Sequence, residues 1–201
     1  MKTILVFLIA LASFVTAYCQ TAVDYYNKGV AKGKLQDYRG AIADFNKAIE
    51  LDPNDWKSYY NRAVSKEKLQ DYMGAIADFS KVIELDPNDK KSYYNRGVAK
   101  DYLQDYTGAI ADYTKVIELD RSDFYALHRR ASSKRELEDY KGAISDYTKV
   151  IELDPSNANA YYSRGLTKGR SGDVDGGCLD LFKASELGHK QASDLIRENC
   201  H

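Results

Sequence analysis

The chain has 201 residues, of which 29 are Lys or Arg, 30 are Asp or Glu, and 44% are hydrophobic. This length fits one or two domains, and the apolar fraction is sufficient to bury a core, so the composition excludes a disordered chain, a collagen and a multi-span membrane protein. The formal net charge of −1 provides no basic surface for a phosphate backbone, whose binding requires many Lys and Arg contacts. We therefore expect no nucleic-acid partner.

The first 20 residues are typical of an export signal, because Lys2 is followed by an apolar run that ends in the triplet Val-Thr-Ala at Ala17. The run is shorter than the roughly 20 residues that cross a bilayer, so it predicts a secretory signal peptide over residues 1–17. We expect cleavage after Ala17, with the bond after Cys19 as second choice. The protein would then be periplasmic or secreted, with no stable membrane span. An uncleaved anchor and a lipid on Cys19 stay open as alternatives, although Tyr18 stands where lipoproteins carry a small residue.

The rest of the chain repeats with a period of 34 residues. Tyrosine, alanine and aspartate each recur at this spacing, at Tyr38, Tyr72, Tyr106 and Tyr140, at Ala41, Ala75, Ala109 and Ala143, and at Asp52, Asp86, Asp120 and Asp154. A fixed period of this length indicates a solenoid or a similar array. It predicts five repeats, 22–55, 56–89, 90–123, 124–157 and 158–191, and residues 192–201 as the end of a capping helix.

Each repeat is predicted to form two helices, the first over about fourteen positions, as in Ala22 to Leu35. An aspartate is well placed to cap each second helix, because a carboxylate accepts hydrogen bonds from otherwise unpaired amides. These aspartates are Asp37, Asp71, Asp105, Asp139 and Asp173. The second helix is expected to stop before a proline, which disfavours helical geometry in the preceding residue. Arg121 and His189 replace that proline in repeats three and five, so we expect less sharply terminated helices there.

This pattern resembles the tetratricopeptide repeat, which has the same period and Gly, Ala, aromatic and Pro residues at fixed offsets. The matching residues of repeat two are Tyr59, Ala63, Tyr72, Ala75, Phe79, Val82 and Pro87. The resemblance covers residues 22–191 and is strongest to exported bacterial members of the family. It implies an all-α fold, a right-handed α-solenoid of five 34-residue helix-turn-helix repeats with a C-terminal capping helix.

Opposite charges recur at positions that the family usually fills with leucine or an aromatic residue. Position seven of each repeat is Lys28, Arg62, Arg96, Arg130 or Arg164, and position eleven is always Lys. Position 23, on the second helix, is always Asp: Asp44, Asp78, Asp112, Asp146 and Asp180. Since basic groups at i and i+4 repel each other on a packed face, we predict an Arg–Asp ion pair inside each repeat. A neutral accident copied by duplication stays open as the alternative.

Cys178 and Cys200 are expected at adjoining ends of two antiparallel helices, and an exported chain favours a disulfide bond between them. Two buried cysteines that never pair are the alternative. Metal binding by this pair with His189 and His201 has suitable atoms but no recognised spacing. We therefore predict neither a metal site nor a cofactor.

The resemblance also implies that the first helices line the concave side of the solenoid and present a binding groove. Position five gives Tyr26, Tyr60, Tyr94, His128 and Tyr162, and position six gives Asn27, Asn61, Asn95 and Arg129. Tyr suits interface anchors, and Asn can pair with the backbone of an extended peptide. The dicarboxylate clamp of some family members needs Lys at position five and Asn at position nine, where this chain has Tyr and mostly Val. That ligand is therefore not expected.

A catalytic role is not predicted, because the sequence has no nucleophile–base set, no Gly-rich phosphate loop and no metal motif. We predict a non-catalytic protein–protein interaction module that binds a peptide or protein segment in a concave groove lined by Tyr and Asn. The alternative is a self-associating structural scaffold of the cell envelope, that is, a homo-oligomer.

Overall fold

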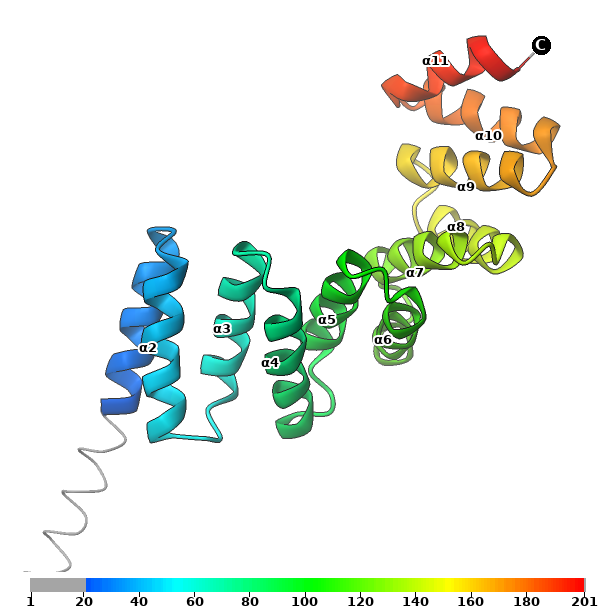
Figure 1. The fold of residues 1–201 in the computed structure, drawn as a ribbon. Coiled ribbons are helices and arrows are strands. Elements are labelled where there is room, and N and C mark those ends of the chain that lie inside the picture. The colour runs from blue at the N-terminus through cyan, green and yellow to red at the C-terminus, as the bar shows by residue number, and fades with distance from the viewer. Residues whose placement is uncertain (1–20, 201) are drawn as a thin grey trace, which may run out of the picture. The chain divides into compact units, whose positions relative to one another are not determined.

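The computed structural model describes residues 21–200. The predicted signal peptide, Cys19 and His201 lie outside these described residues. Over the described range the protein is all-α, and consecutive helices pack in pairs as an α-solenoid (Figure 1). No described helix is long and apolar enough to cross a membrane.

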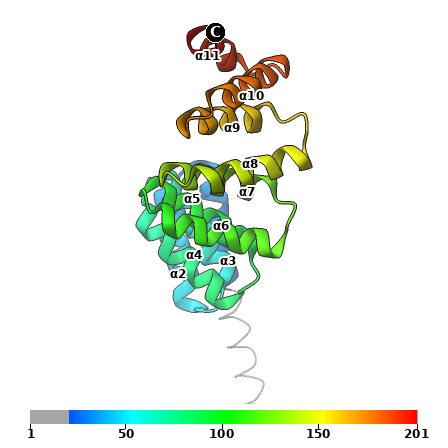
Figure 2. The same ribbon diagram turned by 90° about the vertical axis from the view of Figure 1, so that its right-hand side faces the viewer.

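The described residues divide into two compact units, 21–92 and 93–200, which we call the N-terminal and C-terminal units and describe separately. The N-terminal unit contains the helical residues 21–34, α2 (Tyr38–Leu51), α3 (Trp56–Lys68), α4 (Tyr72–Leu85) and the start of α5 (Lys90–Tyr102). The C-terminal unit contains the rest of α5, then α6 (Tyr106–Leu119), α7 (Phe124–Glu136), α8 (Tyr140–Leu153), α9 (Ala158–Arg170), α10 (Val174–Glu186) and α11 (Lys190–Asn199). Figure 2 shows α9, α10 and α11 stacked on one another from a second direction.

The predicted aspartate caps are confirmed at all five second helices. The Gly40 amide donates a hydrogen bond of 2.9 Å to Oδ1 of Asp37, and the same contact recurs at Asp71, Asp105, Asp139 and Asp173. The residue before each cap has a left-handed backbone, with φ between 61° and 64° at Gln36, Gln70, Gln104 and Glu138. The tight hairpin turn requires this conformation, and Gly172 supplies it in the fifth repeat with φ of 94°.

The expectation of a poorly terminated helix at Arg121 is wrong. Helix α6 ends at Leu119, in the same register as the helices that are followed by proline. The next residue, Asp120, has φ of −148° and ψ of 98°, and its Oδ1 accepts a hydrogen bond of 3.0 Å from the Ser122 amide. This Asx turn, which repeats one, two and four also form, ends the helix without proline.

The corresponding expectation at His189 is also wrong, for a different reason. Helix α10 ends at Glu186, and Gly188 adopts φ of 90°, which reverses the chain just before His189.

In the same hairpin, a Cβ atom on Gly165 would lie only 2.9 Å from the carbonyl oxygen of Gly177. The fifth repeat therefore departs from the sequence pattern where α9 and α10 approach most closely.

The core consists of a layer of small and large apolar side chains between the helices. In the N-terminal unit Ala63 and Ala75 pack against Phe79, and in the C-terminal unit Ala131 and Ala143 pack against Tyr147. At the end of the chain Ala192 of α11 packs on Leu181 and Ala184 of α10. The last helix therefore covers an apolar face that a sixth repeat would otherwise bury.

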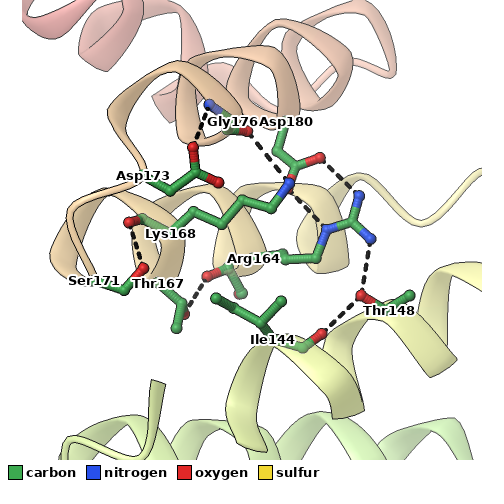
Figure 3. A network of polar contacts seen from close by, with 10 residues as sticks. Ile144, Thr148, Arg164, Thr167, Lys168, Ser171, Asp173, Gly176 and Asp180 are labelled. Carbon is green, nitrogen blue, oxygen red and sulfur yellow. Dashed lines mark hydrogen bonds and ion pairs between the residues drawn. The ribbon is translucent and has the colours of Figure 1, made fainter. Parts of the chain in front are cut away.

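The predicted Arg–Asp pairs are confirmed in repeats two to five. Nε and Nη2 of Arg164 donate to the two carboxylate oxygens of Asp180 at 2.8 and 2.7 Å, and Lys168 lies 2.9 Å from the same carboxylate (Figure 3). Nη1 of Arg164 also donates to Thr148 of the preceding hairpin at 3.0 Å. Nη1 of Arg62 and Nη1 of Arg130 make the equivalent contacts with Asn46 and Thr114, so these three arginines tie their own two helices to the preceding hairpin. The equivalent pairs are Arg62–Asp78, Arg96–Asp112 and Arg130–Asp146.

The prediction is wrong for repeat one, where position seven is lysine. Lys28 is exposed, and its ammonium lies 5.2 Å from the ring centroid of Tyr25. Lys32, one turn later, instead lies 2.7 Å from Asp44. A lysine has no planar guanidinium that could pair with both carboxylate oxygens at once, so the first repeat cannot reproduce the bidentate contact.

Candidate functional site

The position-five side chains lie half-buried on the first helices, and four of them rest against an aromatic ring of the second helix in the same hairpin. The ring centroids are 6.1 Å apart for Tyr26–Phe45, 5.6 Å for Tyr60–Phe79, 5.8 Å for Tyr94–Tyr113 and 5.1 Å for His128–Tyr147. In the fifth repeat, Tyr162 instead stacks on His189, at 4.0 Å and 16°. These rings therefore contribute to packing and keep part of their surface accessible.

The position-six side chains differ in their surroundings. Asn27 and Arg129 are exposed, whereas Asn61 and Asn95 are half-buried. Nδ2 of Asn61 donates to the Lys57 carbonyl oxygen at 2.8 Å and lies 3.5 Å from the hydroxyl of Tyr26. Its donor group is thus already used inside the N-terminal unit, which leaves the carbonyl oxygen as the group for a ligand.

The C-terminal unit has a pocket of about 520 Å³ on its first-helix face. It brings together four of the predicted residues, Tyr94, His128, Arg129 and Tyr162, which come from three successive repeats. The wall also includes residues that the sequence analysis did not single out for binding: Phe124, Tyr125, Val150, Asn157, Asn159, Ser163 and His189. We call this hollow the aromatic pocket. The wall of the aromatic pocket does not include Asn95. The other predicted groove residues belong to the N-terminal unit: Tyr26, Asn27, Tyr60 and Asn61.

His128 is held as a neutral ring inside the aromatic pocket. Burial, with the positive charges of Arg129 and Arg135, lowers the pKa of its imidazole to about 4. Its Nε2 atom lies 3.3 Å from Oγ of Ser163. At neutral pH His128 therefore offers hydrogen-bonding atoms and an aromatic face but no charge.

A polar network lies beside the pocket, where Tyr113 replaces the Phe of the first two repeats. The Tyr113 hydroxyl and the Ser133 hydroxyl each donate to the carboxylate of Asp101 at 2.7 Å. Burial raises the pKa of the Asp101 carboxyl group. The two hydrogen bonds and the nearby positive charge of Arg129 act in the opposite direction but do not cancel this rise. The network ties the third hairpin to the fourth. This network was not predicted, although the change from Phe to Tyr in register is visible in the sequence.

A larger hollow, of about 750 Å³, lies on the second helices α6 and α8. Most of its charged side chains are already paired: Arg130 with Asp146 at 2.7 Å, Lys149 with Glu152 at 2.8 Å and Glu118 with Lys115 at 3.1 Å. The described wall of the larger hollow contains no aromatic side chain, whereas the aromatic pocket has Tyr94, Phe124, Tyr125 and Tyr162, so the aromatic pocket is the better candidate for a binding site.

Cys178 and Cys200 lie together at the end of the chain. Their Cα atoms are 5.7 Å apart and their sulfur atoms 2.02 Å apart. The contact joins α10 to the residue that follows α11. Within residues 21–200 no group of three or more His, Cys, Asp or Glu side chains is arranged to hold a metal ion.

The sequence matches family models of one kind along most of its length. A model described as tetratricopeptide repeat matches residues 22–55, 56–89 and 91–123, and a second model, described as TPR repeat, matches residues 131–172. Among curated proteins, none matches the chain.

Solved structures with the same fold cover nearly the whole chain. The crystal structure of the MamA protein is 25% identical, with a TM-score of 0.81 over 87% of this chain and 95% of that one. MamA from Desulfovibrio magneticus RS-1 is 22% identical, with a TM-score of 0.79 over 85% and 97%. YrrB, described as a TPR protein with an unusual peptide-binding site, is 22% identical, with a TM-score of 0.78 over 88% and 92%. These matches support a protein–protein interaction module.

Proposed function

Because the chain belongs to the tetratricopeptide-repeat family, we propose that it is a non-catalytic module that binds a peptide or protein segment on the face of its first helices. The observation that carries this proposal is the aromatic pocket, a hollow of about 520 Å³ with walls from three successive repeats. The description of the similar YrrB as a protein with a peptide-binding site adds support.

The chemistry of the pocket suits a peptide better than a rigid small molecule. Tyr94, Tyr125 and Tyr162 provide broad apolar contact with polar tips, which is typical of interface anchors. Asn159 adds an exposed side-chain amide, which can both donate to and accept from a peptide backbone, whereas Oδ1 of Asn157 caps α9 by accepting from the Ala160 amide.

The test selects peptides from a displayed random library with the purified protein, and measures their binding by fluorescence anisotropy. The variant Tyr125→Ala with Asn159→Ala removes two exposed groups of the pocket wall, so it leaves the fold intact. We expect it to weaken binding roughly tenfold or more, since an aromatic anchor contributes on the order of 2 kcal/mol. The matched control is Tyr102→Ala with Asn54→Ala, which changes exposed residues outside the pocket. Equal binding by both variants, or a library without enriched peptides, contradicts the proposal.

We further propose that the protein is exported and that Cys178 and Cys200 form a disulfide bond in the exported form. The apolar run before Ala17 supports export, and the short Cys178–Cys200 distance supports the bond. Mass spectrometry of the secreted protein without reducing agent should give a mature N-terminus near residue 18 and a mass two hydrogens below that of the free thiols. An intact Met1 or a full set of free thiols would disprove the corresponding part.

A second candidate function, self-association as a scaffold, is favoured by one observation. Leu179 and Phe182 on α10 are 71% and 48% exposed. At the position of Leu179 the other repeats carry Ala or Ser, and at the position of Phe182 they carry Asn, Ser or Thr. Light scattering over a range of concentrations separates this function from a monomeric binder. A mass that stays at that of one chain excludes it.

A further inference from the structure

The first helix of repeat four differs from its counterparts at the positions that form the aromatic pocket. Its first two residues are Phe124 and Tyr125, and its position-five and position-six residues are His128 and Arg129, where the preceding repeats have Tyr and Asn. The second helices keep almost the same sequence from repeat to repeat, for example YTGAIADYTKVIEL and YKGAISDYTKVIEL. The departures are thus concentrated in the first helix of repeat four, where they include the buried Ala126 and Leu127 as well as the residues of the pocket wall.

Arg129 gives the pocket its only fixed charge among the described lining residues. It is exposed, and within residues 21–200 no carboxylate lies within ion-pairing distance of it. The nearby Asp101 is engaged by Tyr113 and Ser133, and His128 carries no charge at neutral pH. By contrast, the neighbouring Arg130 is fully paired with Asp146. The Arg129 guanidinium is hydrogen-bonded to the Tyr94 side chain and has further N–H groups that can face a ligand.

Around this guanidinium the wall is aromatic. The rings of Phe124 and Tyr125 lie 4.1 Å apart, and Tyr162 stacks on His189. A single arginine can hold one carboxylate through two parallel hydrogen bonds, and the rings favour a planar side chain next to it. A phosphate, which carries nearly two charges, would call for a second cation that the pocket wall does not contain.

We propose that the aromatic pocket selects peptide segments in which Asp or Glu adjoins an aromatic residue, and that Arg129 holds the carboxylate. This inference rests on the proposed function and adds the class of ligand. Repeat four is then the specificity-determining part of the C-terminal unit.

The test uses fluorescein-labelled peptides in one Gly-Ser background with the core Glu-Tyr, Gln-Tyr, Lys-Tyr, Glu-Ser or Gln-phosphotyrosine. The variant Arg129→Asn restores the residue that Asn27, Asn61 and Asn95 provide at this position, so the helix tolerates it. The matched control is Arg39→Asn, an exposed arginine on α2. For the wild type and the control we expect the Glu-Tyr peptide to bind roughly tenfold more tightly than the Gln-Tyr peptide. In Arg129→Asn this difference should vanish, since a double-mutant cycle isolates the pairwise contact.

The outcomes separate this inference from the proposed function. If Glu-Tyr and Gln-Tyr bind equally, and both are weakened by Tyr125→Ala with Asn159→Ala, the pocket binds peptides but the carboxylate selection is wrong. A preference for the Lys-Tyr or phosphotyrosine peptide, or a Glu preference that survives Arg129→Asn, also overturns the inference. If none of these peptides binds the wild type, the inference fails, and the library selection alone decides the proposed function.

Discussion

Replacing Asp146 with Ala should lower the free energy of unfolding by about 3 to 5 kcal/mol, because it leaves two cations buried without their partner. The Asp146 side chain is 8% exposed, and its carboxylate accepts from Arg130 at 2.9 and 2.7 Å and from Lys134 at 2.8 Å. Urea unfolding, followed by circular dichroism, measures the loss. Hydrogen exchange should place the increased opening in α7 and α8, since a solenoid depends on interactions between neighbouring repeats.

A second variant separates the cost of a broken pair from the worth of the pair itself. Asp146→Leu with Arg130→Met and Lys134→Met removes all three charges, and apolar replacements of similar volume are often neutral for stability. We expect this triple variant to recover most of the loss. The control is Glu152→Ala, which breaks an exposed pair with Lys149 and should change stability by less than about 1 kcal/mol. A loss in Asp146→Ala as small as that of the control would contradict the structural role of the buried pairs.

Replacing Phe79 with Ala should lower the free energy of unfolding by about 3 to 5 kcal/mol, because it opens a cavity in the core of the N-terminal unit. The Phe79 side chain is 0% exposed and packs between Ala63 and Ala75, which are too small to fill the space it would leave. The ring also contacts Tyr60 of the first-helix face, at 5.6 Å. The measurement is again equilibrium unfolding in urea.

The matched control is Met73→Ala on the same helix, since Met73 is 70% exposed and should change stability by less than about 0.5 kcal/mol. Phe79→Leu supplies an intermediate step, because it keeps most of the buried volume. If Phe79→Ala were no more destabilising than Met73→Ala, the assigned core of the N-terminal unit would be wrong.

Local and periodic features were predictable from the sequence. The five aspartate caps depend on contacts within three residues, and the fold follows from a period that several positions share. The ion pairs were also predictable, because opposite charges recur 16 positions apart in every repeat. Of the three errors, at Lys28, Arg121 and His189, the first two have the following local causes. An ammonium cannot replace a guanidinium in a bidentate contact, and an Asx turn ends a helix where proline is absent.

The sequence by itself thus determined the tetratricopeptide fold and the charge pattern that links the helices of a hairpin, because each of these is repeated or local. Only the tertiary structure decided which side chains share the aromatic pocket. Tyr94, Arg129 and Tyr162 come from different repeats, and Phe124 and His189 join them through helix packing rather than through any fixed spacing. It also decided that Arg129 faces the pocket while Arg130, the next residue, is buried in an ion pair. One step along a helix turns a side chain by about 100° and so exchanges a structural role for a surface one.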